Sequence, residues 1–199
     1  WIIDIFKKES FGHTGRITGT ATIGGTISEP EFESDGPIAV TALKIGGLDR
    51  LDGAVSVRGS TEELVFSDAE IRRDGIPIMD AEGRWTGGSP FVLIMSGQEI
   101  DMGAISDVIS DDHPTGGIAN YMVTMVFTLD DGTIEGTAKV RDGRFLGVPF
   151  DRVSGTMGGG SKGFRLYDVT AELDDVYTGR AEGGSGFLYK DRTENPGLR

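Results

Sequence analysis

The chain has 199 residues, enough for one large β domain or two smaller units with a substantial core. Its 32 aspartates and glutamates outnumber 19 lysines and arginines, and the net charge of −13 argues against binding nucleic acid or anionic lipid surfaces. The 32 glycines fit many tight turns, and the absence of cysteine excludes disulfides and thiol catalysis.

The first half of the chain is predicted to be almost entirely β-strand. A first strand occupies residues 1–12, and from Gly15 threonines alternate with a row of small and apolar residues, Ile17, Gly19, Ala21 and Ile23. Residues 26–38 contain two prolines and predict an irregular excursion. Turn signals then separate strands expected at about 39–45, 50–58, 63–72, 76–84 and 90–96.

Residues 98–114 carry the one helical pattern in the sequence. Their apolar residues recur at the spacing of one stripe on a helix, at Met102, Ile105, Val108 and Ile109. Asp101 is suited to cap the N-terminus, and Pro114 cannot continue the hydrogen-bond ladder. We therefore expect one short helix near 100–110.

The second half returns to β-strands. A long strand over 121–129 carries the apolar row Val123, Met125, Phe127 and Leu129, and Asp130-Asp131-Gly132 predicts a hairpin turn after it. The next strand alternates polar residues with a second row, Ile134, Gly136, Ala138 and Val140. Further strands are expected at about 144–157, 163–173, 176–183 and 186–190, and residues 191–199 form a polar tail or linker.

The two halves share short sequence matches in the same order. Residues 15–23 match 132–140, residues 48–53 match 150–155, and residues 80–83 match 180–183. We therefore expect a first repeat over 1–115, ending in the short helix, and a second over 116–190. The chain lacks an initiator methionine, a signal peptide and an apolar run of about 20 residues, and we interpret it as a segment of a longer protein.

The alternation predicts an antiparallel sheet with one apolar face, which one short helix cannot cover. The sheet therefore packs on another sheet, closes into a barrel, or shelters an apolar ligand. Small residues such as Gly19, Ala21, Gly136 and Ala138 leave the centre of that face shallow, which suits either a ligand or an opposing sheet.

No chemical motif indicates an enzyme. Ser161 lies in a Gly-x-Ser-x-Gly stretch, but neither His13 nor His113 follows it and no helix is predicted after it. The paired aspartates at 111–112, 130–131 and 174–175 all lie at predicted turns, where they bond their own backbone. We therefore expect no catalytic residue, no metal site and no cofactor.

Four features resemble the AsmA/TamB superfamily of bacterial envelope proteins, which are repeating β-groove or bridge-like lipid transfer proteins. They are the strand 132–140 followed by 144–155, the strand 164–173 that closes at 177–183, the segment 25–30, and Ile100-Asp101-Met102 opening a short helix. Together they cover about residues 15–187. The resemblance implies an all-β fold, a curved, largely antiparallel open β-groove or half-barrel.

The resemblance also implies a function in the periplasm. The groove would shelter phospholipid or related lipid and conduct it between the inner and outer membranes, anchored to the inner membrane through a segment absent from this chain. Acyl chains would be its ligands, and inner- or outer-membrane proteins its partners. The expected lining is Ile17, Gly19, Ala21, Ile23, Val123, Met125, Phe127, Leu129, Ile134, Gly136, Ala138 and Val140. Two alternatives stay open: a β-scaffold or adhesin with a filled core, and a module that aids outer-membrane protein assembly through a strand edge.

Overall fold

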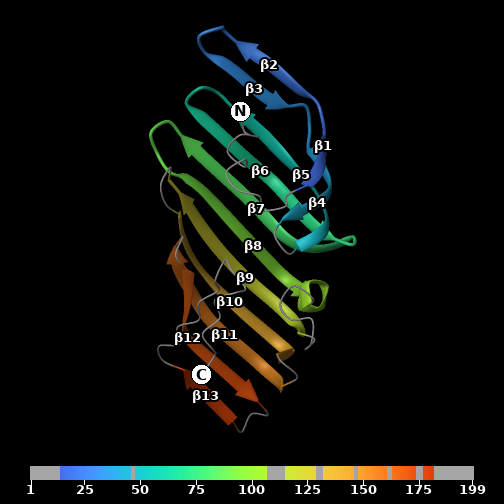
Figure 1. Cartoon of the computed structure of the whole chain (residues 1–199), viewed down its shortest axis with the longest axis vertical. Helices are drawn as coiled ribbons and strands as arrows, with labels where there is room; N and C mark the ends of the chain where they lie inside the picture. Colours follow the sequence, from blue (N-terminus) through green and yellow to red (C-terminus); the bar gives the residue numbers. More distant parts are fainter. Residues whose placement is uncertain are drawn as a thin grey trace.

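The computed structural model describes residues 14–45, 48–106, 115–128, 132–145, 148–160, 163–173 and 177–181. These residues form one 13-stranded sheet in which every pairing is antiparallel. Neighbours in sequence lie side by side from one end of the molecule to the other, and the sheet stays open (Figure 1). The prediction of an all-β, curved, open antiparallel groove is confirmed.

From residue 38 to the C-terminal end of the described chain, each strand pairs with the next. The strands are β4 (Ile38–Ile45), β5 (Leu48–Gly59), β6 (Glu63–Arg73), β7 (Ile76–Thr86), β8 (Phe91–Asp101), β9 (Gly116–Phe127), β10 (Gly132–Phe145), β11 (Val148–Gly160), β12 (Gly163–Leu173) and β13 (Tyr177–Ala181). Because β8 pairs directly with β9, both predicted repeats contribute to one sheet. Their equivalence as repeats stays a prediction.

The N-terminal segment is one long, interrupted hairpin. Strands β1 (Thr14–Thr18) and β2 (Ala21–Gly25) pair with β4 and with β3 (Pro30–Ser34), respectively. Two predictions are wrong here: the excursion over 26–38 contains β3, and the strand expected over 17–23 breaks between β1 and β2. The opposite strand explains the break, because Pro37 has no N–H and Gly36 takes a φ of 112°. The Asp35 N–H bonds the Thr20 carbonyl across the gap at 3.0 Å.

The predicted helix begins later than expected, and its first turn is tighter than that of an α-helix. Strand β8 continues through Asp101, which pairs with Ile118, and only then does a 3-10 helix, η1 (Met102–Ile105), begin. Strand pairing thus overrides the helical pattern at its start. Asp101 is the N-cap, as predicted, because its Oδ1 accepts a hydrogen bond from the Gly103 N–H at 2.8 Å. Residues 107–114, with Val108, Ile109 and Pro114, lie outside the described residues.

A β-bulge recurs in every second strand from β4 to β12. At each one, two residues of the even-numbered strand oppose one of a neighbour. One of the two is a non-glycine residue with φ between 51° and 54°: Ala42, Asp68, Glu99, Asp142 and Asp168. The backbone N–H of Ala42 donates a hydrogen bond to Asp52 Oδ1 on the next strand at 3.0 Å. The N–H of Glu99 likewise donates to Asn120 Oδ1 at 3.0 Å. Bulges bend a strand and increase its twist, so this series favours a curved sheet.

We predict that Gly53→Ala lowers the free energy of unfolding by about 1–3 kcal/mol. A methyl group at Gly53 would lie 2.5 Å from the Glu70 carbonyl oxygen of the neighbouring strand. Gly24→Ala is the matched control, because nothing lies within 4 Å of its Cβ position. Urea denaturation of both variants checks this, and equal stabilities would contradict the close approach of β5 and β6.

Candidate functional site

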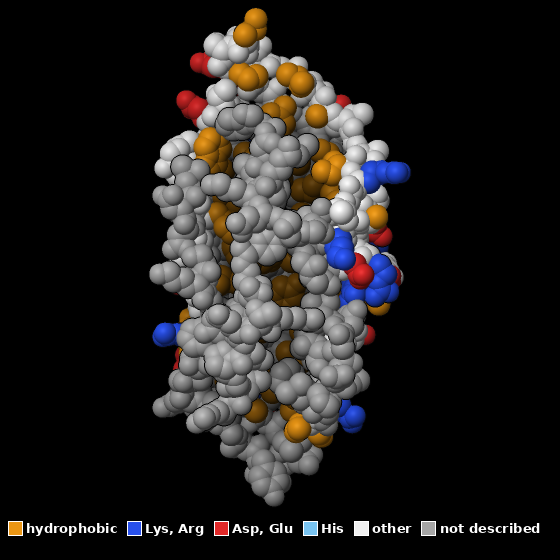
Figure 2. All heavy atoms as spheres, viewed as in Figure 1, with side chains coloured by type: hydrophobic (Ala, Val, Ile, Leu, Met, Phe, Trp, Pro, Cys, Tyr) orange, Lys and Arg blue, Asp and Glu red, His pale blue; other side chains and the backbone are white. Residues whose placement is uncertain are grey.

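One face of the sheet is apolar across almost all of its strands. Residues directly opposite each other in antiparallel strands share a face, so the register identifies its members. We define as the inner face the side that carries Ile17, Val40, Gly53, Ile71, Ala69, Ala81, Met95, Val123, Gly136, Met157 and Leu166. Figure 2 shows hydrophobic side chains along a hollow, with charged side chains toward its edges.

The structure brings together two of the three predicted rows at the centre of the inner face. Val123 lies opposite Gly136 and Met125 lies opposite Ile134, while Ala138 and Val140 pair with Tyr121 and Ala119. The intervening residues Thr133, Glu135, Thr137 and Lys139 are exposed. Phe127 lies at the end of its row opposite Gly132, and Leu129 lies outside the described residues.

The third predicted row lies at the edge of this face. Ile17 pairs with Val40, and Ile23 pairs with Phe32, whose strand β3 joins β5. The Cβ position of Gly19 is 3.0 Å from the Ile38 side chain, and Ala21 lies opposite Ser34. Ile17 and Ile23 are 74% and 79% exposed. These residues therefore form a margin of the inner face and not its floor.

The inner face is not a filled core. Among the described residues, only Leu51, Ile78, Ile100, Ala119 and Val123 are buried apolar side chains, and four of them form one cluster beside η1. Elsewhere large side chains keep contact with solvent, as does Phe127 with 42% exposure. Within the described ranges η1 is also the one helix, and no second sheet packs on this face. A protein of this size with a closed core would bury many more apolar side chains.

Aromatic rings fill part of the space that glycines leave. Phe91 meets Phe66 edge-on at 5.9 Å between ring centroids and stacks with Phe127 at 6.2 Å. Its ring also lies 2.8 Å from the Cβ position of Gly83, on the neighbouring strand. Sequence reasoning missed this arrangement, because the ring and the glycine come from different strands. The Phe91 ring thus occupies the space above Gly83, which makes the inner face shallower at this position.

Gly136 has a different role from the one predicted. Its Cβ position is 2.6 Å from the Met122 carbonyl oxygen, so the close approach of β9 and β10 requires glycine. The position is shallow because two backbones approach each other. Ala138 is therefore the better place to test what the inner face binds.

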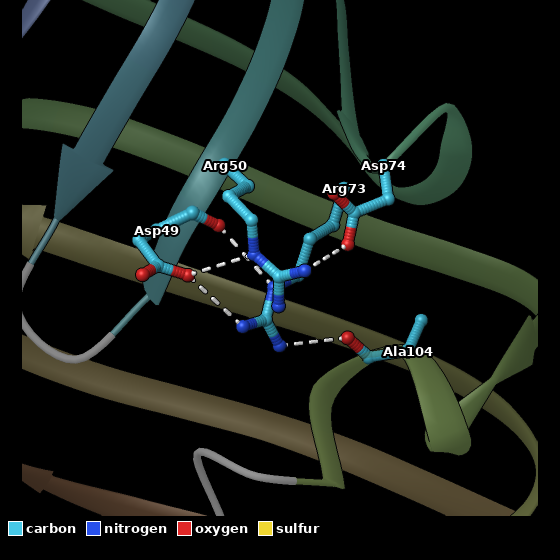
Figure 3. A network of polar contacts seen from close by, with 5 residues as sticks. All are labelled: Asp49, Arg50, Arg73, Asp74 and Ala104. Atoms are coloured by element: carbon cyan, nitrogen blue, oxygen red, sulfur yellow. Dashed lines mark hydrogen bonds and ion pairs between the residues drawn. The ribbon is translucent and has the colours of Figure 1, made fainter.

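Arg73 is the one charged side chain buried among the described residues, with 2% exposure. It lies opposite Leu51, at the margin of the inner face beside η1. Its guanidinium donates to the Asp49 carbonyl at 3.2 Å, to Asp49 Oδ1 at 3.1 Å and to the Ala104 carbonyl at 2.8 Å (Figure 3). The hydrogen bonds from Arg73 and then Arg50 lower the pKa of Asp49. Sequence reasoning missed Arg73, although its alternation with Ile71 indicated the inner face.

Tyr121 crosses the same region. Its hydroxyl donates to the Ile78 carbonyl at 2.6 Å, which ties β9 to β7 past the intervening β8. Burial, and then the nearby Asp80 carboxylate, raise the pKa of Tyr121 from 10.0 to about 12. The Tyr121 ring thus packs against the buried apolar cluster beside η1, and its neutral hydroxyl is satisfied by a backbone carbonyl.

The described ranges do not bring the chemical candidates of the sequence together. Within those ranges no three His, Asp and Glu side chains converge to hold a metal ion, and Ser161, His13 and His113 lie outside them. None of the described helices is long and apolar enough to cross a membrane. The sequence matches no family model, no curated protein and no solved structure.

We predict that the free energy of unfolding falls less between pH 10 and about 12 in Tyr121→Phe than in the unaltered chain. In that window the unfolded chain loses the tyrosine proton while the folded chain keeps it, so the free energy of unfolding falls as pH rises. At neutral pH the variant loses about 0.5–1.5 kcal/mol with its hydrogen bond. Urea denaturation across this pH range checks both effects. Tyr167→Phe, on the opposite face, is the control, and an identical change in both variants would contradict the assignment.

Proposed function

We propose that this chain is a segment of a lipid-handling protein whose inner face shelters acyl chains. The observation that carries the proposal is the mismatch between a broad apolar face and a small core. Residues from β1 to β12 place apolar side chains on the inner face, yet five apolar side chains are buried in the described chain. An apolar face of this extent that the protein does not fill marks a binding surface.

The physics of acyl binding fits such a face. Each methylene removed from water contributes about 0.8 kcal/mol, so full burial of a tail of about 16 carbons would contribute on the order of 10 kcal/mol. An open groove covers one side of the tail, so the contribution is roughly half of that. This binding needs no polar site and no fixed position along the face. A lipid can therefore occupy many equivalent positions, as a conduit requires.

The resemblance to AsmA/TamB-like proteins extends this proposal. In such a protein the groove conducts phospholipid or related lipid between the inner and outer membranes, and the chain lies in the periplasm. An open antiparallel sheet with bulges in alternate strands supports that architecture, because it can continue through further hairpins without closing. Inner- and outer-membrane proteins are the partners that this function implies.

A filled-core scaffold or adhesin is the weaker alternative, because the half-exposed side chains of the inner face would be an aggregation liability without a ligand. A module that aids outer-membrane protein assembly has one observation in its favour. Strand β1 pairs only with β4 in the described chain and carries the exposed Ile17, as an edge open to strand addition would. Both alternatives leave the centre of the inner face without lipid.

We predict that Ala138→Asp in the full-length protein reduces lipid binding and passage at least tenfold. Ala138 lies between Tyr121 and Gly155 on the inner face, where a carboxylate would be desolvated beside an acyl chain at a cost of several kcal/mol. Thr137→Asp is the matched control, one residue away on the exposed face, and is expected to be nearly silent. Photocrosslinking to lipid in cells, from position 138 against 135 and 137, measures the difference.

Equal labelling from both faces, or none from position 138, would contradict the proposal. It would leave the filled-core scaffold as the better account. Circular dichroism of both aspartate variants checks that the sheet remains folded.

A further inference from the structure

The best-buried apolar place on the inner face lies under the helix η1. Leu51, Ile78, Ile100 and Ala119 form this seat, and each is at most 6% exposed. The seat is continuous with the proposed lipid-binding floor, because Ala119 lies opposite Val140 and next to the row through Tyr121 and Val123. An acyl chain sliding along the inner face would therefore meet it after passing Tyr121, whose hydroxyl is bonded to the Ile78 carbonyl.

The chain itself occupies this seat. Met102, Ala104 and Ile105 of η1 pack against the buried cluster, in the position that the proposed function assigns to a lipid tail elsewhere on the face. None of the three is itself buried, so the cover that the described chain provides is thin. A 3-10 helix of four residues has poor hydrogen-bond geometry and little stability of its own. What holds η1 in place must come from the sheet.

Arg73 fastens η1 to the sheet through a hydrogen bond. Its guanidinium reaches from β6 to the Ala104 carbonyl of η1 at 2.8 Å and is fixed from the other side by the Asp49 carbonyl and carboxylate (Figure 3). We name Asp49, Arg73 and the Ala104 carbonyl the clasp. The Asp49 side chain is 51% exposed, and it also bonds Arg50, which in turn pairs with Asp74 at 2.8 Å. One end of the clasp, the Arg73 side chain, is therefore buried, while the other end, the Asp49 carboxylate, is accessible to solvent.

A clasp of this kind is a poor way to build a permanent core. An apolar side chain at position 73, opposite Leu51, would close the seat without the cost of burying a cation. Hydrogen bonds to a partly exposed carboxylate and a carbonyl can instead be exchanged for water when the cover moves. The arrangement therefore consists of a buried apolar cluster, the short helix η1 that covers it, and the hydrogen bond from Arg73 that keeps η1 in place.

We propose that the seat under η1 is a second acyl-chain site, which η1 occupies as an internal substitute and which opens when the clasp releases. This inference rests on the proposed function, because it assigns the same ligand class to a covered part of the same face. The occupant is a single lipid tail, because the cover that it replaces is one short row of apolar side chains, those of Met102, Ala104 and Ile105.

The test compares Arg73→Met with the unaltered chain. Methionine keeps an apolar stem but removes all three donors of the clasp, so we expect the amides of 102–106 to exchange hydrogen about tenfold faster or more. Arg72→Met is the matched control, because Arg72 is the exposed neighbour that pairs with Glu70. Each protein is then irradiated with palmitic acid carrying a photoactivatable diazirine, and the crosslinked residues are mapped by mass spectrometry.

We expect Met125 and Ile134 to be labelled in all three proteins, and Ile78, Ile100 and Ala119 to gain label at least fivefold in Arg73→Met alone. Unchanged exchange in Arg73→Met, or faster exchange without label in the seat, overturns the inference and leaves the proposed function standing. Absence of label from Met125 and Ile134 in the unaltered chain overturns both. If Arg73→Met fails to fold, Asp49→Ala, which removes the side-chain acceptor and keeps the backbone carbonyl contact of residue 49, replaces it with the same two readouts.

Discussion

An antiparallel sheet satisfies its backbone hydrogen bonds between neighbouring strands, but it leaves the side chains of each face to find their own cover. In this chain one face is apolar from β1 to β12, and the described chain covers it at one place only, under η1. The other features of the structure adapt to this constraint. Curvature turns the apolar face inward, and aromatic rings pack over part of it. The opposite face carries polar residues such as Thr133 and Thr137, together with apolar ones such as Val126 and Met122.

The bulges and the glycines act together in shaping that face. Bulge residues such as Asp68 and Glu99 lie exposed with left-handed backbone, and the hydrogen bond from Asn120 satisfies the N–H of Glu99. Gly53 and Gly136 allow neighbouring strands to approach where a side chain would collide with a carbonyl. Because the bulges recur every second strand, each hairpin adds a similar bend. The sheet can therefore lengthen as a groove without closing as a barrel.

Much of this fold could be predicted from the sequence, because alternation is a local property. The rows through Val123 and Ile134 share a face as expected, and Asp101 caps a helix as expected. Features that depend on pairing between strands could not be predicted. Strand β3, the late start of the helix at Met102 and the bulge at Ala42 all depend on what the neighbouring strand offers. The role of Arg73 depends on Asp49 and Ala104, which are distant in sequence and meet only in the folded sheet.

The central claim is that lipid, and not protein, completes the inner face. Native mass spectrometry of the chain, purified without detergent from a bacterial envelope fraction, tests it most directly. The account predicts folded protein carrying mass increments of phospholipid, which organic extraction removes with exposure of apolar surface to a fluorescent dye. A folded, lipid-free protein that neither binds the dye nor takes up added phospholipid would contradict it, because its apolar face would then be covered by the chain itself.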